Sequence, residues 1–376
     1  MNLRYGGMSD TAKVTSWWIG TRLLTLVVAL VGSWAAVSDS DSPFGGYVEL
    51  WNQWDTRWFE SIATEGYVGT YVSDFEDFRY NVAFFPGLPL LMRTAVFIGV
   101  PPVFIGIAVS LIAGWVAAMA LLRLSQQVGG RGWLAPFAWI VAPTAVFLTA
   151  AYTEALFAAF AFWAWAMARE RAWLAAGLLA GASAFVRPNA IFLTAGLAVL
   201  FVLSRPRTLR GWLGGWPLLL PIAVVLGYFA YLRSLTGSWT AWFDAQRDFW
   251  DRQLVDPVTS FMNTYELIFT FSPTGEPSSR MVSEIIAMGV LIAVVIASVI
   301  KRWWAESVYV LVTAVSLGTS SMYYSIPRTL ILIFPLWILL GLWLERARWR
   351  PWAYGIVSIP SLAVITVLFT QGQWIS

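Results

Sequence analysis

The sequence of 376 residues contains no cysteine and no histidine. Without cysteine there can be no disulfide and no thiolate metal site. Without histidine there can be no imidazole base, no histidine-bound metal and no Ser-His-Asp catalysis. Charged residues are also scarce, at 12% of the chain, against roughly 25% in a soluble domain. Any acid or base catalysis must therefore use carboxylates, lysine or tyrosine.

Several sequence motifs are missing as well. The chain has no Walker A lysine motif, no GxGxxG turn, no GxSxG elbow and no HExxH helix. Their absence argues against nucleotide-driven transport, Rossmann cofactors and serine or zinc hydrolysis. We expect no cofactor, no resident metal and no nucleic-acid partner.

Apolar residues are abundant, at 59% of the chain, and they form long runs that can cross about 30 Å of hydrocarbon. This pattern predicts an all-α polytopic membrane protein with a single domain over residues 1–376. The first run lacks a small-residue cleavage site, so we interpret it as a span rather than a cleavable signal peptide. The predicted spans are 14–37, 102–122, 133–150, 154–168, 172–186, 190–204, 212–232, 281–300, 304–320, 328–344 and 351–370.

The charged residues predict how these eleven spans are oriented, because basic loops favour the cytoplasmic side. The predicted inner set is Arg4, Lys13, Arg123, Arg131, Arg169, Arg171, the 205–210 cluster, Lys301, Arg302 and the 346–350 cluster. The loop 38–83 carries the acids Asp39, Asp41, Glu49, Asp55, Glu60, Glu65, Asp74, Glu76 and Asp77. We therefore expect a cytoplasmic N-terminus, with the loops 38–83 and 233–280 outside.

This topology requires that residues 84–99 do not cross the membrane. The segment contains Pro86, Pro89 and Arg93, and proline interrupts helices. We interpret it as juxtamembrane helix lying in the interface, so that the first outer loop extends over 38–101.

Asp55 stands in an aromatic stretch just after the first span. If residues 51–63 form one helix at about 100° per residue, Trp51, Trp54 and Trp58 lie on one stripe, with Asp55 within roughly 40° of Trp51. A solvated acid would normally lie opposite the aromatic side chains. An acid held among tryptophans outside a span is a candidate for a tuned pKa and a chemical role.

Further polar residues gather at the outer ends of predicted spans. Glu154, after Tyr152 and Thr153, is either a residue reaching for the interface or a second acid facing the Asp55 loop. Arg187 and Arg328 run against the positive-inside pattern, so they either pair with acids or bind an anion such as phosphate. Glu284 lies at the outer start of another predicted span, and we expect its role to be mainly structural.

The second outer loop holds an amphipathic aromatic segment, residues 239–252. One interpretation is a helix lying on the membrane surface. The other is a lid over a lipid-linked substrate, with Gln246, Arg247 or Arg252 reaching into the site. Aromatic faces bind sugar rings as well as lipid, so the tryptophans of this segment do not decide between the two. Trp54 and Tyr152 are further candidate substrate-binding residues.

Taken in order, the motifs resemble the GPI mannosyltransferase 2 (PIG-V) family of integral-membrane glycosyltransferases with the GT-C fold. The matching stretches are Trp54-Asp55, Phe59, Ile62-Ala63, Glu65-Gly66-Tyr67, residues 84–89, Tyr152-Thr153-Glu154, residues 155–157, residues 182–189 with Arg187-Pro188, residues 245–252, Pro327-Arg328 and Phe334-Pro335. The chain departs from the family where Thr56, Arg57 and Trp58 replace a frequent histidine. It also has Pro86-Gly87-Leu88-Pro89 in place of a more usual Pro-Leu-Tyr-Pro.

The resemblance implies a GT-C fold and a mannosyltransferase that takes mannose from polyprenyl-phosphate-mannose on the extracytoplasmic face of the cell membrane. It implies that Asp55 is catalytic and places the family's further acid and arginine on Glu154 and Arg187. The composition looks bacterial, and bacteria generally make no GPI anchor, so the expected acceptor is a hydroxyl of a glycolipid, a lipoglycan or a protein.

Combined with the outer position of these residues, the resemblance predicts an inverting, metal-independent transfer with Asp55 as general base. Arg187 and Arg328 would stabilise the leaving phosphate, and a divalent ion between Asp55 and Glu154 is disfavoured. Two other classes remain open. A transporter or flippase of a lipid-linked sugar would use the same arginines without a base, and a structural partner of a cell-envelope complex would need neither.

Overall fold

The computed structural model describes residues 8–36, 43–67, 78–204, 208–270 and 278–375. Within these ranges the chain is helical, with a single isolated β-bridge between Leu254 and Ser320. The elements are α1 (Asp10–Ala36), α2 (Pro43–Glu49), α3 (Asp55–Glu65), η1 (Phe78–Ala83), α4 (Gly87–Met92), α5 (Thr94–Ile98), α6 (Pro102–Gln127), α7 (Leu134–Ile140), η2 (Pro143–Leu148), α8 (Thr153–Arg169), α9 (Trp173–Val186), α10 (Ala190–Leu203), α11 (Leu209–Leu213), η3 (Trp216–Leu219), α12 (Leu220–Thr236), α13 (Ala241–Trp250), α14 (Pro257–Thr270), α15 (Ser279–Ile300), α16 (Trp304–Gly318), α17 (Ile326–Thr329), η4 (Leu330–Leu332), α18 (Phe334–Leu344) and α19 (Arg350–Thr370).

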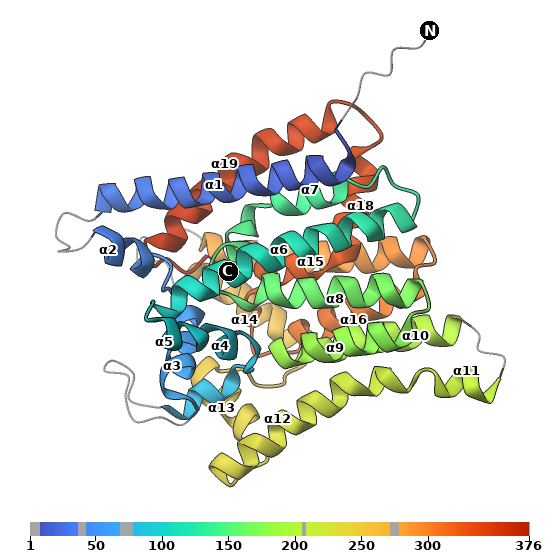
Figure 1. Ribbon diagram of the computed structural model, residues 1–376, viewed down its shortest axis with the longest axis horizontal. Helices are drawn as coiled ribbons and strands as arrows, with labels where there is room; N and C mark the ends of the chain where they lie inside the picture. Colours follow the sequence, from blue (N-terminus) through green and yellow to red (C-terminus); the bar gives the residue numbers. More distant parts are fainter. Residues whose placement is uncertain (1–7, 37–42, 68–77, 205–207, 271–277, 376) are drawn as a thin grey trace.

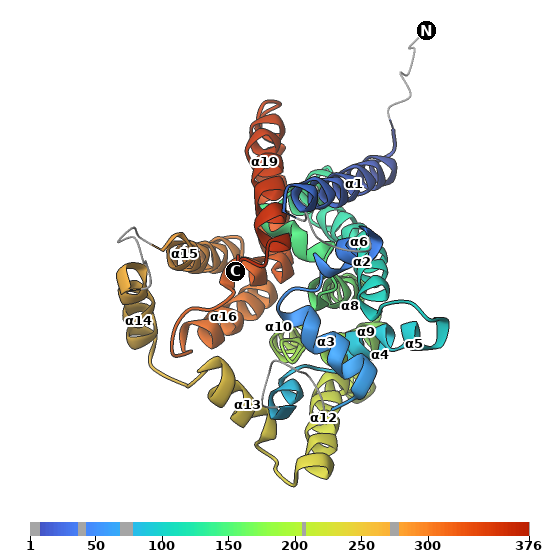
Figure 2. The ribbon, with the colours of Figure 1, turned by 90° about the vertical axis from the view of Figure 1, so that its left-hand side faces the viewer.

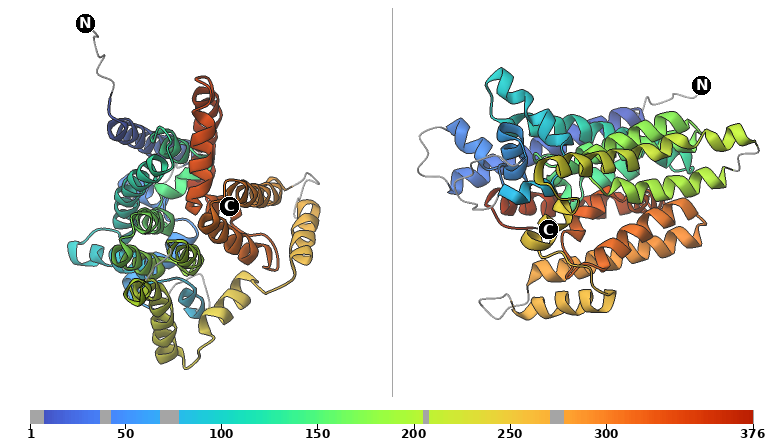
Figure 3. Two further views of the ribbon diagram at one scale, coloured as in Figure 1. Left: turned by 90° about the vertical axis from the view of Figure 1, so that its right-hand side faces the viewer. Right: turned by 90° about the horizontal axis from the view of Figure 1, so that it is seen from below.

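The longer helices lie roughly alongside one another, and the short helices α2, α3, α4, α5 and α13 gather at one end of the bundle (Figure 1). Seen from that end, α13 lies between α12 on one side and α14 on the other (Figure 2). Helix α8 is central and packs against α6 and α9, and Figure 3 shows the same bundle from its opposite end. The gathering of short helices therefore marks one end of the bundle as different from the other.

Close helix packing in the bundle depends on small residues, as is common among membrane helices. The neighbouring helices α6 and α8 both bury small residues, among them Ala117 and Ala118 of α6 and Ala155 and Ala158 of α8. Where α6 meets α1, a Cβ added to Gly114 would lie 2.3 Å from the Trp18 ring. Only glycine permits this approach.

The expectation of eleven spans is only partly supported. Among the described residues five helices are long and apolar enough to cross a membrane, in the ranges Asp10–Gly32, Pro102–Gln127, Leu209–Thr236, Ser279–Ile300 and Arg350–Thr370. A sixth is possible if the broken pair Ile326–Leu332 and Phe334–Leu344, bent by 77°, counts as one span. The remaining predicted spans coincide with shorter helices such as α9, α10 and α16. The chain is thus an all-helical membrane protein with five or six candidate spans.

At the break between η4 and α18, three aromatic side chains donate hydrogen bonds to consecutive backbone carbonyls. Trp337 Nε1 donates to Leu330 O at 3.0 Å, Trp139 Nε1 to Ile331 O at 2.9 Å, and Tyr309 Oη to Leu332 O at 2.9 Å. A polar backbone group left unpaired in an apolar interior costs several kcal/mol. These three hydrogen bonds therefore stabilise the break in the helix.

A buried arginine stabilises a second break, between α7 and η2. Arg22 of α1 is 3% exposed. Its Nη1 donates to Ala145 O at 2.7 Å and to Thr149 Oγ1 at 3.0 Å, and its Nη2 donates to Ile140 O at 2.8 Å. The guanidinium group thus lies among carbonyl and hydroxyl oxygens, and no carboxylate of the described residues pairs with it.

The predicted helix over residues 51–63 is wrong at its beginning. Trp54 has φ 53°, and α3 begins only at Asp55. The tryptophan stripe therefore does not exist: Trp51 is buried against Phe369, whereas Trp54 is 39% exposed. The positive φ at Trp54 turns the chain just before α3, and the Asp55 side chain contacts Arg328.

Residues 84–99 form two short helices, α4 and α5, rather than a span. α4 is packed against α3 and α6, whereas α5 exposes Phe97 and Ile98, at 83% and 64%. Exposed apolar residues on a short helix fit the predicted position in the interface. The predicted orientation of the chain is not tested by these features. Of the predicted outer acids, Asp39, Asp41, Asp74, Glu76 and Asp77 lie outside the described residues, as do Arg4, Arg205 and Arg207 of the predicted inner set.

Candidate functional site

Glu154 lies at the centre of a buried ionic cluster. It is the second residue of α8 and is fully buried. Its Oε1 accepts hydrogen bonds from Arg187 Nη1 and Arg328 Nε, and its Oε2 has no hydrogen-bond partner among the described residues. A buried carboxylate is tolerated when it is paired in this way, so the interpretation of Glu154 as a residue reaching for the interface is wrong.

Arg187 reaches this cluster because α9 ends just before it. The backbone of Arg187 is extended, at φ −151° and ψ 140°, which is the conformation that a following proline favours, and Pro188 follows. The Arg187 guanidinium also donates from Nη1 to Thr153 Oγ1 at 2.7 Å. Its side chain is 18% exposed.

Arg328 connects the two acids. It lies in α17, at the start of the broken helix, and its side chain is 8% exposed. Nη1 lies 2.6 Å from Asp55 Oδ2, while Nε is bonded to Glu154. The guanidinium carbon stands 4.6 Å from the centre of the Tyr152 ring, a distance at which a cation is attracted to an aromatic face.

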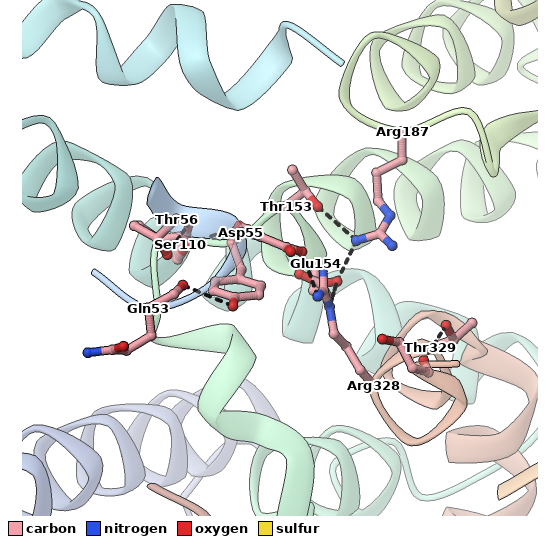
Figure 4. Close-up of polar contacts among 12 residues, drawn as sticks. Gln53, Asp55, Thr56, Ser110, Thr153, Glu154, Arg187, Arg328 and Thr329 are labelled. Carbon is pink, nitrogen blue, oxygen red and sulfur yellow. Dashed lines mark hydrogen bonds and ion pairs between the residues drawn. The ribbon is translucent and has the colours of Figure 1, made fainter. Parts of the chain in front are cut away.

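Asp55 is the first residue of α3, and its side chain is 13% exposed. The four groups therefore alternate in charge, in the order Asp55, Arg328, Glu154, Arg187 (Figure 4). They come from four helices or helix ends that lie far apart in the sequence. The cluster confirms the expectation that these four residues lie together; their chemical roles remain predictions.

The cluster opens into a cavity of about 840 Å³. Its polar lining includes Asp55, Arg187, Gln246, Arg247, Arg252 and Arg328. Its apolar lining includes Ile191 and Phe192 of α10, Val225 and Phe229 of α12, and Leu317 of α16. Aromatic side chains complete it, among them Phe84, Trp242, Trp250, Tyr324 and Trp374. The cavity is therefore charged where it meets α3, α9 and α17, and apolar where it meets α10, α12 and α16.

The predicted amphipathic segment of the second loop is a helix, α13, and it contributes to the cavity wall. Arg247 is paired with Asp244 at 3.1 Å and Asp248 at 2.8 Å, and its side chain is 54% exposed. Arg252 has no ion pair among the described residues and lies 5.2 Å from the centre of the Tyr324 ring. Of these two arginines, Arg252 is the one available for an anionic ligand.

Two predicted substrate-binding residues do not line the cavity. Trp54 packs edge-on against Trp374 at 4.7 Å. Tyr152 is buried beneath Arg328, and its hydroxyl donates to Gln53 O at 3.1 Å. Tyr152 therefore supports Arg328 and the residues just before α3. The structure does not place the Tyr152 or Trp54 side chain where a substrate in the cavity would contact it.

The sequence reasoning missed a second aromatic and basic group at the cavity. The Arg280 guanidinium lies 5.1 Å from the Tyr324 ring and 5.2 Å from the Trp374 ring. Arg280 precedes a predicted span on its outer end, so the signal that singled out Arg187 could also have found it. Trp374 follows the last predicted span and carries no such signal. Glu284 has the expected structural role, since it accepts from the backbone N–H groups of Ser325 and Ile326 at 2.8 Å.

The described residues contain no group of three or more Asp and Glu side chains that could hold a metal ion. Metal independence remains a prediction, and activity after EDTA treatment tests it directly.

Comparison with known proteins finds a structural similarity alone. No model of a known protein family matches the sequence, and no curated protein matches it. The solved structure of ArnT from Cupriavidus metallidurans, bound to undecaprenyl phosphate, is similar with a TM-score of 0.54 and 13% sequence identity. The match covers 91% of this chain and 62% of ArnT, so the chain spans less than two thirds of the length of ArnT.

A second solved structure, the Archaeoglobus fulgidus oligosaccharyltransferase in complex with zinc and sulfate, has a TM-score of 0.46 and 8% identity. That match covers 95% of this chain and 53% of the oligosaccharyltransferase, and we draw nothing from it. The similarity to ArnT shows that the fold is GT-C-like. The more specific resemblance to PIG-V has no support in these comparisons.

Proposed function

We propose that this protein is a membrane glycosyltransferase that moves a sugar from a polyprenyl-phosphate donor to an acceptor hydroxyl, with Asp55 as general base. The observation that carries the proposal is the cavity that joins a buried acid–arginine cluster to an apolar wall. A donor of this class has the same two parts, since a charged phosphate and sugar are attached to a long apolar chain.

Each part of the donor has a complementary part of the cavity. The apolar side chains of α10, α12 and α16, including Phe192, Phe229 and Leu317, suit the polyprenyl chain. Arg187 and Arg252 offer guanidinium groups to a phosphate. The fold supports the same donor class, because ArnT, which shares it, was crystallised with undecaprenyl phosphate.

The proposed reaction is a single inverting displacement. Asp55 takes the proton of the acceptor hydroxyl while that oxygen forms a bond to the anomeric carbon. The bond from the anomeric carbon to the phosphate oxygen breaks, and polyprenyl phosphate leaves with the electron pair. Positioned general-base catalysis supplies about 10²- to 10⁴-fold in rate, and arginines near the phosphate stabilise its growing charge.

Arg328 has a specific part in this mechanism. Its contact with Asp55 Oδ2 at 2.6 Å fixes the direction of the carboxylate. The Glu154 carboxylate and the Tyr152 ring hold the arginine in turn. Arg328 is thus a positioning residue for the base, and it lines the cavity where the phosphate would lie.

The finer statement is that the sugar is mannose, that a β-linked donor gives an α-linked product, and that transfer takes place on the extracytoplasmic face. It rests on the resemblance of the motifs to the PIG-V family and on the distribution of basic residues. The acceptor would be a glycolipid, a lipoglycan or a protein hydroxyl.

The test is transfer from radiolabelled polyprenyl-phosphate-mannose to a membrane lipid extract, using purified wild type and Asp55→Asn. We expect Asp55→Asn to fold, because Arg328 keeps its contact with Glu154, and to lose transfer by at least about 10²-fold. Glu65→Gln, which changes an exposed acid at the other end of α3, is the matched control and should transfer normally.

Normal transfer by Asp55→Asn would contradict the proposed base. Movement of the labelled lipid across vesicles by both wild type and Asp55→Asn, without any glycosylated product, would instead identify a flippase.

A further inference from the structure

A second cavity, of about 660 Å³, lies at the opposite end of the bundle from Asp55. It is lined by the C-terminal ends of α6, α8 and α10 and by the turn that joins α15 to α16. These are the right-hand helix ends in Figure 1. Helix α8 has 17 residues, so its two ends are about 25 Å apart. The cavity is therefore separate from the site proposed for sugar transfer.

The charges in this second cavity do not cancel. Arg123 is paired with Glu170 at 2.8 Å, and Arg169 is paired with Glu306 at 2.5 Å. Arg302 also lines the cavity, is exposed, and has no ion pair or side-chain hydrogen bond among the described residues. Three guanidinium groups face two carboxylates, so the lining carries one unbalanced positive charge.

Both carboxylates have further donors. Glu170 also accepts from Gln127 Nε2 at 3.0 Å, and Glu306 accepts from Trp165 Nε1 at 3.1 Å. Each carboxylate already has a guanidinium partner and a second donor, so neither acid adds an unpaired negative charge to the lining. The cavity thus favours an anion without a cationic group.

Apolar surface continues from the charged lining. Leu203 of α10 and Trp304 of α16 line the cavity and are each 48% exposed, and Trp303 lies beside them. Tryptophan beside arginine at helix ends is typical of the boundary between lipid and water. The ligand should therefore carry acyl chains as well as negative charge.

We propose that this cavity binds the headgroup of an anionic phospholipid, with Arg302 contacting its phosphodiester and the acyl chains lying along Leu203 and Trp304. One phosphodiester carries the single negative charge that balances the lining. The predicted orientation places this end of the bundle at the cytoplasmic leaflet, where anionic lipids attract basic clusters.

The experiment measures thermal unfolding of the protein, purified in a neutral detergent, during titration with phosphatidylglycerol, phosphatidylcholine or glycerol 3-phosphate. Arg302→Asn removes the unpaired charge and suits the positive φ of this residue, 58°, since asparagine tolerates that region. Arg348→Asn, at an exposed arginine outside the cavity, is the matched control.

We expect phosphatidylglycerol to raise Tm of wild type and of Arg348→Asn at the same concentration, and Arg302→Asn to need about tenfold more. Native mass spectrometry should find one phosphatidylglycerol fewer on Arg302→Asn. The comparison between variants isolates this cavity, because lipid bound beside Asp55 is the same in all three proteins.

Three results would overturn the proposal. The first is an unchanged response of Arg302→Asn to phosphatidylglycerol. The second is equal stabilisation by phosphatidylcholine, which would mean that negative charge is not recognised. The third is the same shift with glycerol 3-phosphate, which would indicate a site for a soluble phosphate.

Discussion

Glu154 holds two cations with one oxygen atom. Both Arg187 and Arg328 donate to its Oε1, and the residue is fully buried. Among the described residues, the ion pair that joins Asp55 to the other three charged groups is the one with Arg328. The two acids therefore differ in role: Glu154 organises the arginines, and Asp55, at the cavity wall, is the acid that can meet a substrate.

Replacing Glu154 should consequently harm the fold as well as the activity. In Glu154→Gln two largely buried guanidinium groups lose their common carboxylate, and breaking a buried ion pair by removing one partner costs about 3–5 kcal/mol. We expect a clearly lower Tm of the purified protein and loss of transfer. Asp55→Asn should keep a Tm close to that of wild type, so equal Tm values for the two variants would contradict this division of roles.

The cluster of Asp55, Glu154, Arg187 and Arg328 could be predicted from the sequence because Glu154, Arg187 and Arg328 are charged residues at the outer ends of predicted spans, and Asp55 lies in the outer loop on the same side. Acids and outer arginines at span ends are expensive, so they are expected to find one another. The surroundings of Asp55 could not be predicted, because the helical period gives the wrong result when one residue, Trp54, takes a positive φ. Nothing in the local sequence requires that conformation of a tryptophan.

At the scale of elements, the broken helix α17–η4–α18 places Arg328 at the site. Three consecutive carbonyls at the break accept from Trp337, Trp139 and Tyr309. Two of these donors come from α7 and α16, so neighbouring helices fix the position of the break. Residues of other helices therefore help to position the segment that carries Arg328.

Removing one donor tests this role. Trp139→Phe keeps most of the buried ring but leaves Ile331 O unpaired, which should cost about 1–3 kcal/mol. We expect a lower Tm and weaker transfer, since the break also positions Arg328. Trp352→Phe, at a tryptophan that is 74% exposed, is the control. Unchanged Tm in Trp139→Phe would show that the break is stable without this bond.

The sequence predicts where most helices lie but not how they are interrupted. Apolar runs locate helices near every predicted span. Pro143 and Pro335 stand close to the two breaks, yet proline alone does not show which donor pairs with the freed carbonyls. Most of those donors come from residues far away in the chain, such as Trp139 for Ile331, and a local pattern carries no information about them.

At the scale of the whole molecule, the two cavities lie at opposite ends of one bundle. The predicted topology assigns the Asp55 end to the outside and the Arg302 end to the inside. The structure supports five or six spans rather than eleven by length and composition. Helices of 14 or 15 residues such as α9 and α16 pack against longer neighbours, α8 and α12 for α9 and α15 for α16, so they need not match the full hydrocarbon thickness alone.

The natural absence of cysteine makes the orientation simple to test. Single cysteines can be introduced at Gln253 and Arg348, which are both exposed. In intact cells a membrane-impermeant maleimide should label Gln253→Cys, and it should label Arg348→Cys only after the membrane is opened. The reverse pattern would invert the topology and move the Asp55 cavity to the cytoplasmic side.

Arg22 has a consequence for the order in which the chain is made. Its guanidinium lies near the middle of α1, and its acceptors are Ile140, Ala145 and Thr149, more than one hundred residues later. During synthesis α1 therefore leaves the ribosome and enters the bilayer before any of these oxygens exists. An arginine at the centre of a span opposes insertion by about 2.5–3.5 kcal/mol. Helix α1 is thus inserted while the Arg22 guanidinium still lacks these hydrogen bonds. They form only after α7 and η2 have been synthesised and have packed against α1.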